Sequence, residues 1–198
     1  ARSEGEVTIT ASYDIGSVSC AVTVWTDYIG SGEEFYAIYE RENWAQGWYL
    51  LTDDIEIPPI GSDPAHSEGI LNYTYVKGSP QFSGMLDGGG HTLGNIYGRL
   101  FMGVNGGTIR NVKLKGESGY WGGLFGDYFE SGLVENVTAE ITFTKTEATN
   151  NTTDWWKRST GGFFNYAQGG TFRNVTVYAV IPDDIDTDAS TEATAMIS

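Results

Sequence analysis

Two adjacent tryptophans, Trp155 and Trp156, lie in a polar segment, Lys145 to Thr160, that also holds amide and charged side chains. Aromatic faces beside hydrogen-bond donors form platforms for sugars, and loops on a rigid scaffold are where binding residues concentrate. The alternative is that both rings fold back over the coil as a lid, and for an adjacent pair at least one ring is expected to do so. The predicted ligand-binding residues, for a glycan or a cell-surface protein, are Trp155, Trp156, Tyr120, Trp121 and Tyr128.

Residues that could perform catalysis or hold a metal are sparse. The chain has two histidines, His66 and His91, and one cysteine, Cys20, without the ligand spacing of a zinc site. Polysaccharide lyases and hydrolases need clustered carboxylates, whereas Asp87 stands alone in a glycine-rich phrase. The sequence therefore predicts a non-enzymatic protein with no catalytic residue, metal or cofactor.

Composition and charge argue against several further classes of protein. With 40% hydrophobic and 14% aromatic residues, the chain can bury a core and is expected to fold. Its formal net charge of −15 repels polyanions, so nucleic-acid binding is not expected. No apolar run approaches the roughly 20 residues that span a bilayer, which predicts a protein that is not membrane-embedded.

An internal repeat predicts the fold class. The signature apolar-x-Asn-apolar recurs at Leu93–Ile96, Ile109–Val112, Val134–Val137 and Phe172–Val175, and the last three copies follow Phe101, Phe125 and Phe164 at a nearly constant distance. Repeats of this size are typical of a stacked solenoid.

Stacking places equivalent residues in columns about 4.8 Å apart. We expect two inward aliphatic columns, one of Ile96, Val112, Val137 and Val175 and one of Leu93, Ile109, Val134 and Phe172, and an internal stack of the three phenylalanines. The column of Asn95, Asn111, Asn136 and Asn174 could be a binding row, but stacked amides that bond to one another are favoured. Arg110, Glu135 and Arg173, each just before an asparagine, should pair across coils.

Two elements are expected before the repeats. Alternating apolar residues over 6–25, interrupted by Asp14-Ile15-Gly16, predict a β-hairpin. Ser31 followed by Glu34 has the spacing of a capping box, which predicts a short helix from about Gly32 to Asn43. Its apolar face should cover the open end of the first coil.

Particular phrases resemble known families. The phrases Tyr49 to Ile57, Pro59-Ile60-Gly61 and Phe82 to Leu93, with the later repeats, resemble bacterial right-handed β-helices with GLUG-type repeats, over about residues 30–181. For His91, within the phrase Phe82 to Leu93, the resemblance implies a turn hydrogen bond. The two runs of the hairpin resemble the last two strands of a group 2 bacterial immunoglobulin-like domain.

The expected architecture is all-β: a right-handed parallel β-helix (solenoid) with a short N-terminal capping helix and a β-hairpin remnant of an immunoglobulin-like domain. The expected parts are 1–28, the immunoglobulin-like strands; 29–47, the capping helix and linker; 48–181, the β-helix with insertions at about 62–81 and 145–160; and 182–198, an acidic tail. Since the hairpin resembles only the end of a domain, either the chain is a fragment or the hairpin packs on something else. Because the first residue is Ala1, the chain is expected to be processed or cut from something longer.

Three functions remain open. The first is an extracellular, cell-surface adhesion module that binds a glycan or a protein through its loops. The second is a phage or virion component, a fibre or head decoration that assembles into a larger particle. The third is a polysaccharide-active enzyme, lyase or hydrolase, for which the required residues are missing.

Overall fold

The computed structural model describes residues 4–58, 80–97, 100–118, 124–143 and 163–180. Most of these residues form strands, and the helical turns are short. The elements, in chain order, are β1 (Gly5–Tyr13), β2 (Gly16–Val24), β3 (Asp27–Ile29), α1 (Gly32–Ala37), η1 (Ile38–Glu40), η2 (Trp44–Gln46), β4 (Trp48–Leu51), β5 (Ile55–Glu56), β6 (Met85–Asp87), β7 (Thr92–Tyr97), β8 (Phe101–Ser118), β9 (Gly126–Phe143), β10 (Phe164–Ala167) and β11 (Thr171–Val180). Nearly all of the two predicted insertions, and the acidic tail, lie outside the described residues.

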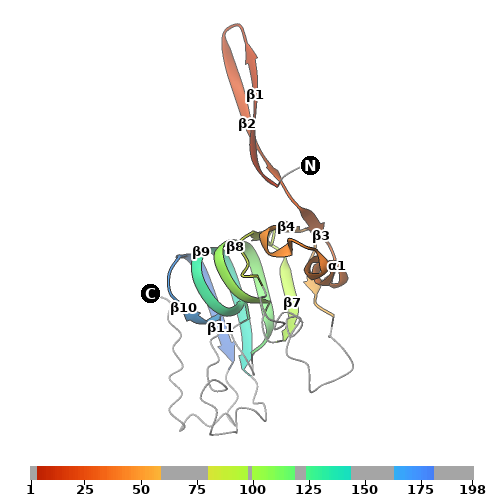
Figure 1. Ribbon diagram of the computed structural model, residues 1–198, viewed down its shortest axis with the longest axis vertical. Helices are drawn as coiled ribbons and strands as arrows, with labels where there is room; N and C mark the ends of the chain where they lie inside the picture. Colours follow the sequence, from red (N-terminus) through yellow and green to blue (C-terminus); the bar gives the residue numbers. More distant parts are fainter. Residues whose placement is uncertain (1–3, 59–79, 98–99, 119–123, 144–162, 181–198) are drawn as a thin grey trace.

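The body of the protein is a curled parallel sheet (Figure 1). Its main order is β10-β9-β8-β6-β4-β3, while β11 pairs with β9 and β7 pairs with both β5 and β8. One line of register partners runs Leu86, Ile109, Val134, Phe172 through β6, β8, β9 and β11. The expectation of a mostly β chain with parallel strands is therefore confirmed.

Asparagines in the left-handed region bend the long strands and explain the repeated signature. Asn111, Asn136 and Asn174 have φ values of 52°, 52° and 49°. Residues three apart in a straight strand would face opposite sides of the sheet, yet Ile109 and Val112 are both buried. The asparagine bend returns the second apolar residue to the interior, and asparagine tolerates this conformation better than most residues.

The first copy of the signature does not belong to these columns, which corrects the sequence prediction. Leu93 pairs with Leu114, and Leu86 is the residue opposite Ile109. The register between β7 and β8 shifts between Leu93 and Ile96, and Asn95 in this irregularity donates from its amide nitrogen to Ile57 O at 2.6 Å. A bulge also requires an unusual backbone conformation, and Asn95 has a φ of 55°. The same asparagine signature therefore occurs here at a bulge and not at a bend of the long strands.

The predicted phenylalanine stack is present only in part. All three rings are buried, but Phe101 and Phe164 both lie opposite Gly126, so Phe125 is offset by one residue. Phe101 stacks on Phe82 at a centroid distance of 4.3 Å, and Phe125 stacks on Phe164 at 5.9 Å. A Cβ at Gly126 would lie 2.7 Å from Phe101 O, so this close approach of the strands leaves room only for glycine.

The helix begins as predicted and ends earlier. Ser31 Oγ accepts a hydrogen bond from Glu34 N at 3.2 Å, and the Glu34 carboxylate accepts from Gly30 N at 2.8 Å. However, α1 ends at Ala37 and continues as the 3-10 turn η1, so the expectation of a helix to Asn43 is wrong. After this turn, Trp44 stacks on Phe101 with their ring centroids 6.2 Å apart.

The first turns of this segment cover the β3 end of the sheet. Phe35 and Ile38 are fully buried in the same core as the sheet, and Tyr39 donates its hydroxyl hydrogen to Leu100 O at 3.0 Å. The ribbon lies beside β3, the edge strand of the main order (Figure 1). The predicted cap is therefore present, with its burial shared between α1 and η1.

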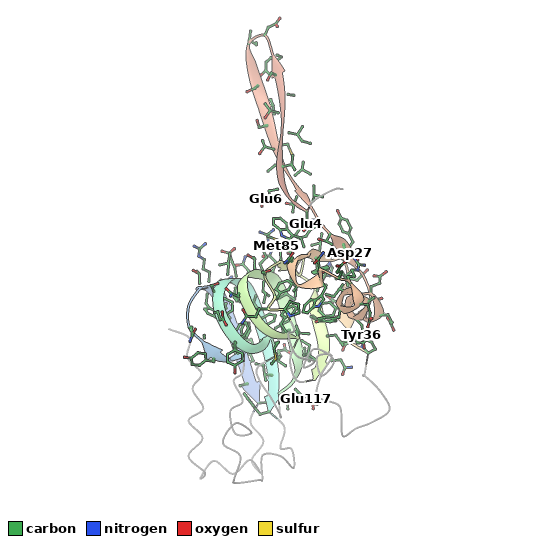
Figure 2. All side chains as sticks on the ribbon, in the orientation of Figure 1. Glu4, Glu6, Asp27, Tyr36, Met85 and Glu117 are labelled. Carbon is green, nitrogen blue, oxygen red and sulfur yellow. The ribbon has the colours of Figure 1, made fainter. Side chains whose placement is uncertain are left out.

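The predicted hairpin, β1 and β2, stands away from the body (Figure 1). Its antiparallel register pairs Val7 with Val22, Ile9 with Cys20 and Ala11 with Val18, so one face is apolar. Figure 2 shows side chains projecting into open space along both of its sides, and most of the hairpin is exposed. At its base, Trp25 contacts Trp48 at a centroid distance of 6.4 Å.

Candidate functional site

Two exposed tyrosines lie side by side on the outer surface of the parallel sheet. Tyr128 of β9 pairs in register with Tyr166 of β10, and their ring centroids are 6.3 Å apart at an interplanar angle of 74°. Their exposed fractions are 48% and 52%, whereas the neighbouring Phe129 and Phe164 are buried. Alternation of side chains along β9 directs Phe129 into the core and the adjacent Tyr128 to solvent, and Tyr166 lies opposite Tyr128 in register.

Just after Tyr128 in the chain, polar side chains of β8 and β9 hydrogen-bond to one another and to Gln81. The Glu130 carboxylate accepts hydrogen bonds from Gln81 Nε2 at 2.7 Å and from Asn105 Nδ2 at 3.0 Å, and Ser131 Oγ donates to Asn105 Oδ1 at 2.8 Å. These bonds orient Glu130 without using its full acceptor capacity, since a carboxylate has about four acceptor positions. Glu130 follows Tyr128 by two residues in β9, at an irregularity where the register with β8 passes from Phe129 to Ser131.

The edges of the tyrosine pair differ in chemistry. Gln168 Nε2 donates to Tyr166 Oη at 3.3 Å, so an amide borders one ring. On the other side, the register partner of Tyr128 is Gly103, which is buried. The exposed tyrosine pair therefore has an amide beside Tyr166 and is followed in β9 by the Glu130 carboxylate. We call Tyr128, Tyr166, Glu130 and Gln168 the tyrosine surface.

This arrangement suits binding of a flat ligand with many hydroxyl groups. Aromatic rings offer apolar faces against which the C–H side of a sugar can pack, while the carboxylate and amides accept and donate hydrogen bonds. In the described ranges, no group of three or more histidine, cysteine, aspartate or glutamate residues is arranged to hold a metal ion. Among those same residues, no helix is long and apolar enough to cross a membrane.

Of the five residues predicted to bind ligand, one is placed here. Tyr128 is on the tyrosine surface, while Trp155, Trp156, Tyr120 and Trp121 lie outside the described residues. Tyr166, Glu130 and Gln168 were not predicted from the sequence. An alignment of the repeats at Gly126 and Phe164, which are register partners, would have put Tyr128 and Tyr166 in one column.

Asp87 and the asparagine row form a structural network. The Asp87 carboxylate accepts from Gly89 N at 2.9 Å, Asn111 Nδ2 at 3.1 Å and Arg110 Nε at 2.7 Å. The amide of Asn136 then donates to Asn111 Oδ1, and that of Asn174 to Asn136 Oδ1. The predicted amide ladder is confirmed for Asn111, Asn136 and Asn174, and it begins at Asp87 instead of Asn95.

Charges alternate along the neighbouring column, as the sequence predicted. Arg110, Glu135 and Arg173 are register partners, and Arg173 Nη1 lies 3.6 Å from Glu135 Oε1. Asp87 adds an acidic residue before Arg110. The column therefore reads acid, base, acid, base from β6 to β11.

His91 and Asp54 make a second polar contact, which closes a turn. His91 N donates to Gly88 O at 2.7 Å, as the turn assignment expected, and His91 Nδ1 lies 3.4 Å from Asp54 Oδ1. The hydrogen bond from Thr92 N at 2.8 Å, followed by the bond from His91, lowers the pKa of Asp54. The pair joins the segment before β5 to the start of β7.

Comparisons of the chain with protein-family models, with curated proteins and with solved structures found no match.

Proposed function

We propose that this chain is a non-enzymatic, extracellular surface module that acts in adhesion by binding a glycan through the tyrosine surface. The observation that carries the proposal is the exposed pair Tyr128 and Tyr166, held in register on adjacent parallel strands. Large aromatic side chains left in solvent on a rigid sheet, next to an oriented carboxylate, are typical of a binding surface.

The fold proposed for this module is a right-handed parallel β-helix with GLUG-type repeats. Support comes from the parallel register of β6, β8, β9 and β11 and from the amide ladder that links equivalent positions. A scaffold of this kind presents outward side chains in fixed columns, which suits a repetitive ligand such as a polysaccharide.

A glycan array tests the function. The wild-type chain and the double variant Tyr128→Ala/Tyr166→Ala are compared with Tyr178→Ala, which removes an exposed tyrosine from β11. We expect the wild type and Tyr178→Ala to bind the same glycans, and the double variant to bind at least about tenfold more weakly, a loss of about 1.4 kcal/mol. Unchanged binding by the double variant, or loss only on Trp155→Ala/Trp156→Ala, would refute the assignment to the tyrosine surface.

A virion or fibre component is the second candidate, and one observation favours it. The apolar face of the hairpin, which holds Val7, Ile9 and Val18, is exposed and projects from the body. Two-stranded hairpins are marginal in water by themselves, so such a face is usually covered by further strands. We propose that these two strands complete an immunoglobulin-like sheet, as their resemblance to that domain implies. Co-purification of the chain with particles of defined symmetry would favour this candidate over a free adhesin.

A further inference from the structure

The last strand level of the parallel sheet, β10 and β11, has one unpaired edge in the described part of the chain. Phe172 is 38% exposed, whereas its register partner Val134 is fully buried. Val175 and Val177 are half-buried, although their partners Val137 and Ala139 are buried. The residues that form the core in earlier strands are thus left partly in solvent in β11.

The amide ladder also stops at β11 with an acceptor unused. Each asparagine donates its amide hydrogen to the residue in the preceding strand, from Asn174 to Asn136 to Asn111 to Asp87. In the described residues, Asn174 Oδ1 receives no hydrogen bond. A further strand that follows the same rule would place a side-chain amide donor opposite Asn174.

The column of charged residues beside the asparagines also indicates what a further strand would carry. The column runs Asp87, Arg110, Glu135, Arg173, and the final arginine is 65% exposed. An acidic residue in the next strand would continue the alternation and pair with Arg173. Opposite charges directly across a strand pair stabilise it, and like charges destabilise it.

We propose that β11 is a docking edge for an extended segment of another polypeptide that adds in parallel and carries the sequence apolar-acidic-Asn-apolar. The acidic residue lies opposite Arg173, the asparagine opposite Asn174, and the flanking apolar residues cover Phe172 and Val175. Strand addition of this kind gains main-chain hydrogen bonds for affinity and uses the side-chain columns for selectivity. This interaction is independent of the tyrosine surface.

The chain itself supplies a probe that fits these requirements. The segment Gly132–Phe143 contains Val134-Glu135-Asn136-Val137 and already pairs in parallel with β11 on its other edge. A fluorescent synthetic peptide of this segment is titrated against the full chain by anisotropy. We expect saturable binding, and binding about three- to tenfold weaker when the peptide carries Glu135→Lys, as the exchange of an ion pair for a repulsion would give.

A charge exchange supplies the decisive control. The Arg173→Glu chain should bind the lysine peptide better than the wild-type peptide, and circular dichroism checks that the variant folds, since Arg173 is exposed. Two results would overturn the proposal: no saturable binding of the wild-type peptide, or equal binding of both peptides to both chains. Binding that appears only after removal of residues 182–198 would also overturn it, since the chain's own tail would then be the occupant.

Discussion

Arg110 Nε donates to the buried carboxylate of Asp87 across adjacent strands, at 2.7 Å. The same carboxylate accepts from the backbone of its own turn and from the first amide of the ladder. Asp87 therefore joins a glycine turn, the charge column and the asparagine column.

Replacing this carboxylate should be costly. Asp87→Ala leaves the partly buried Arg110 without its partner and removes two further hydrogen bonds, so we expect unfolding free energy to fall by roughly 2–4 kcal/mol. Urea unfolding followed by circular dichroism measures this. Lys115→Ala is the matched control because the Lys115–Glu140 pair is exposed, at 3.2 Å, and should contribute less than about 1 kcal/mol. Equal losses in the two variants would show that Asp87 has no special role.

Two substitutions at Asn136 separate its backbone role from its hydrogen bonds. Asn136→Gly keeps the left-handed conformation at φ 52° and loses both amide bonds, whereas Asn136→Ala loses the bonds and adds backbone strain. We expect the alanine variant to be less stable than the glycine variant by about 1 kcal/mol, since strain of about 1–2 kcal/mol is partly offset by the greater unfolded-state freedom of glycine. Thermal and urea unfolding give the two values. A glycine variant no more stable than the alanine variant would contradict the bend as the reason for the signature.

Alkaline pH should destabilise the fold through Tyr49. Burial raises the pKa of Tyr49 to about 12, and its hydroxyl donates to Trp44 O at 2.7 Å. Because the folded pKa is above the ordinary value of 10.0, this contribution to stability is complete below pH 10 and is lost as pH rises toward 12. Burial also raises the pKa of Tyr39, in the same direction.

The variant Tyr49→Phe checks this assignment. Its urea midpoint should fall less steeply between pH 10 and 12 than that of the wild type, although its stability at pH 7 is lower because one hydrogen bond is lost. Tyr28→Phe removes an exposed hydroxyl and should leave the pH dependence unchanged. A wild-type slope that persists in Tyr49→Phe would assign the alkaline loss to another group.

The repeat signature predicted the columns well because burial and the asparagine bend act on equivalent residues of β8, β9 and β11. It placed Ile109, Val134 and Phe172 in one column, and Val112, Val137 and Val175 in another, as the register shows. It misplaced Leu93 and Asn95 because a bulge uses the same left-handed asparagine as a corner. The local sequence is the same at the bulge and at the bends of the long strands. Only the pairing of β7 with β8 distinguishes them.

The helix and the candidate site show a different limit. The capping residues predicted the start of α1 correctly, but no local signal marked its end at Ala37, and the segment that follows packs through Trp44 on the distant Phe101. Likewise, Tyr166 and Glu130 are unremarkable in sequence and become a surface with Tyr128 only through the strand register. The composition of the segment around Trp155 and Trp156 predicted a binding loop there, whereas the aromatic surface among the described residues lies on β9 and β10.

Backbone amide chemical-shift mapping, with a glycan selected by the array, tests the central claim most directly. We expect the largest perturbations, on addition of the glycan to isotope-labelled protein, at Gly103–Asn105, Gly126–Ser131 and Phe164–Gln168, which form and border the tyrosine surface. Perturbations confined to the hairpin, or to residues 145–160, would contradict glycan binding at the tyrosine surface.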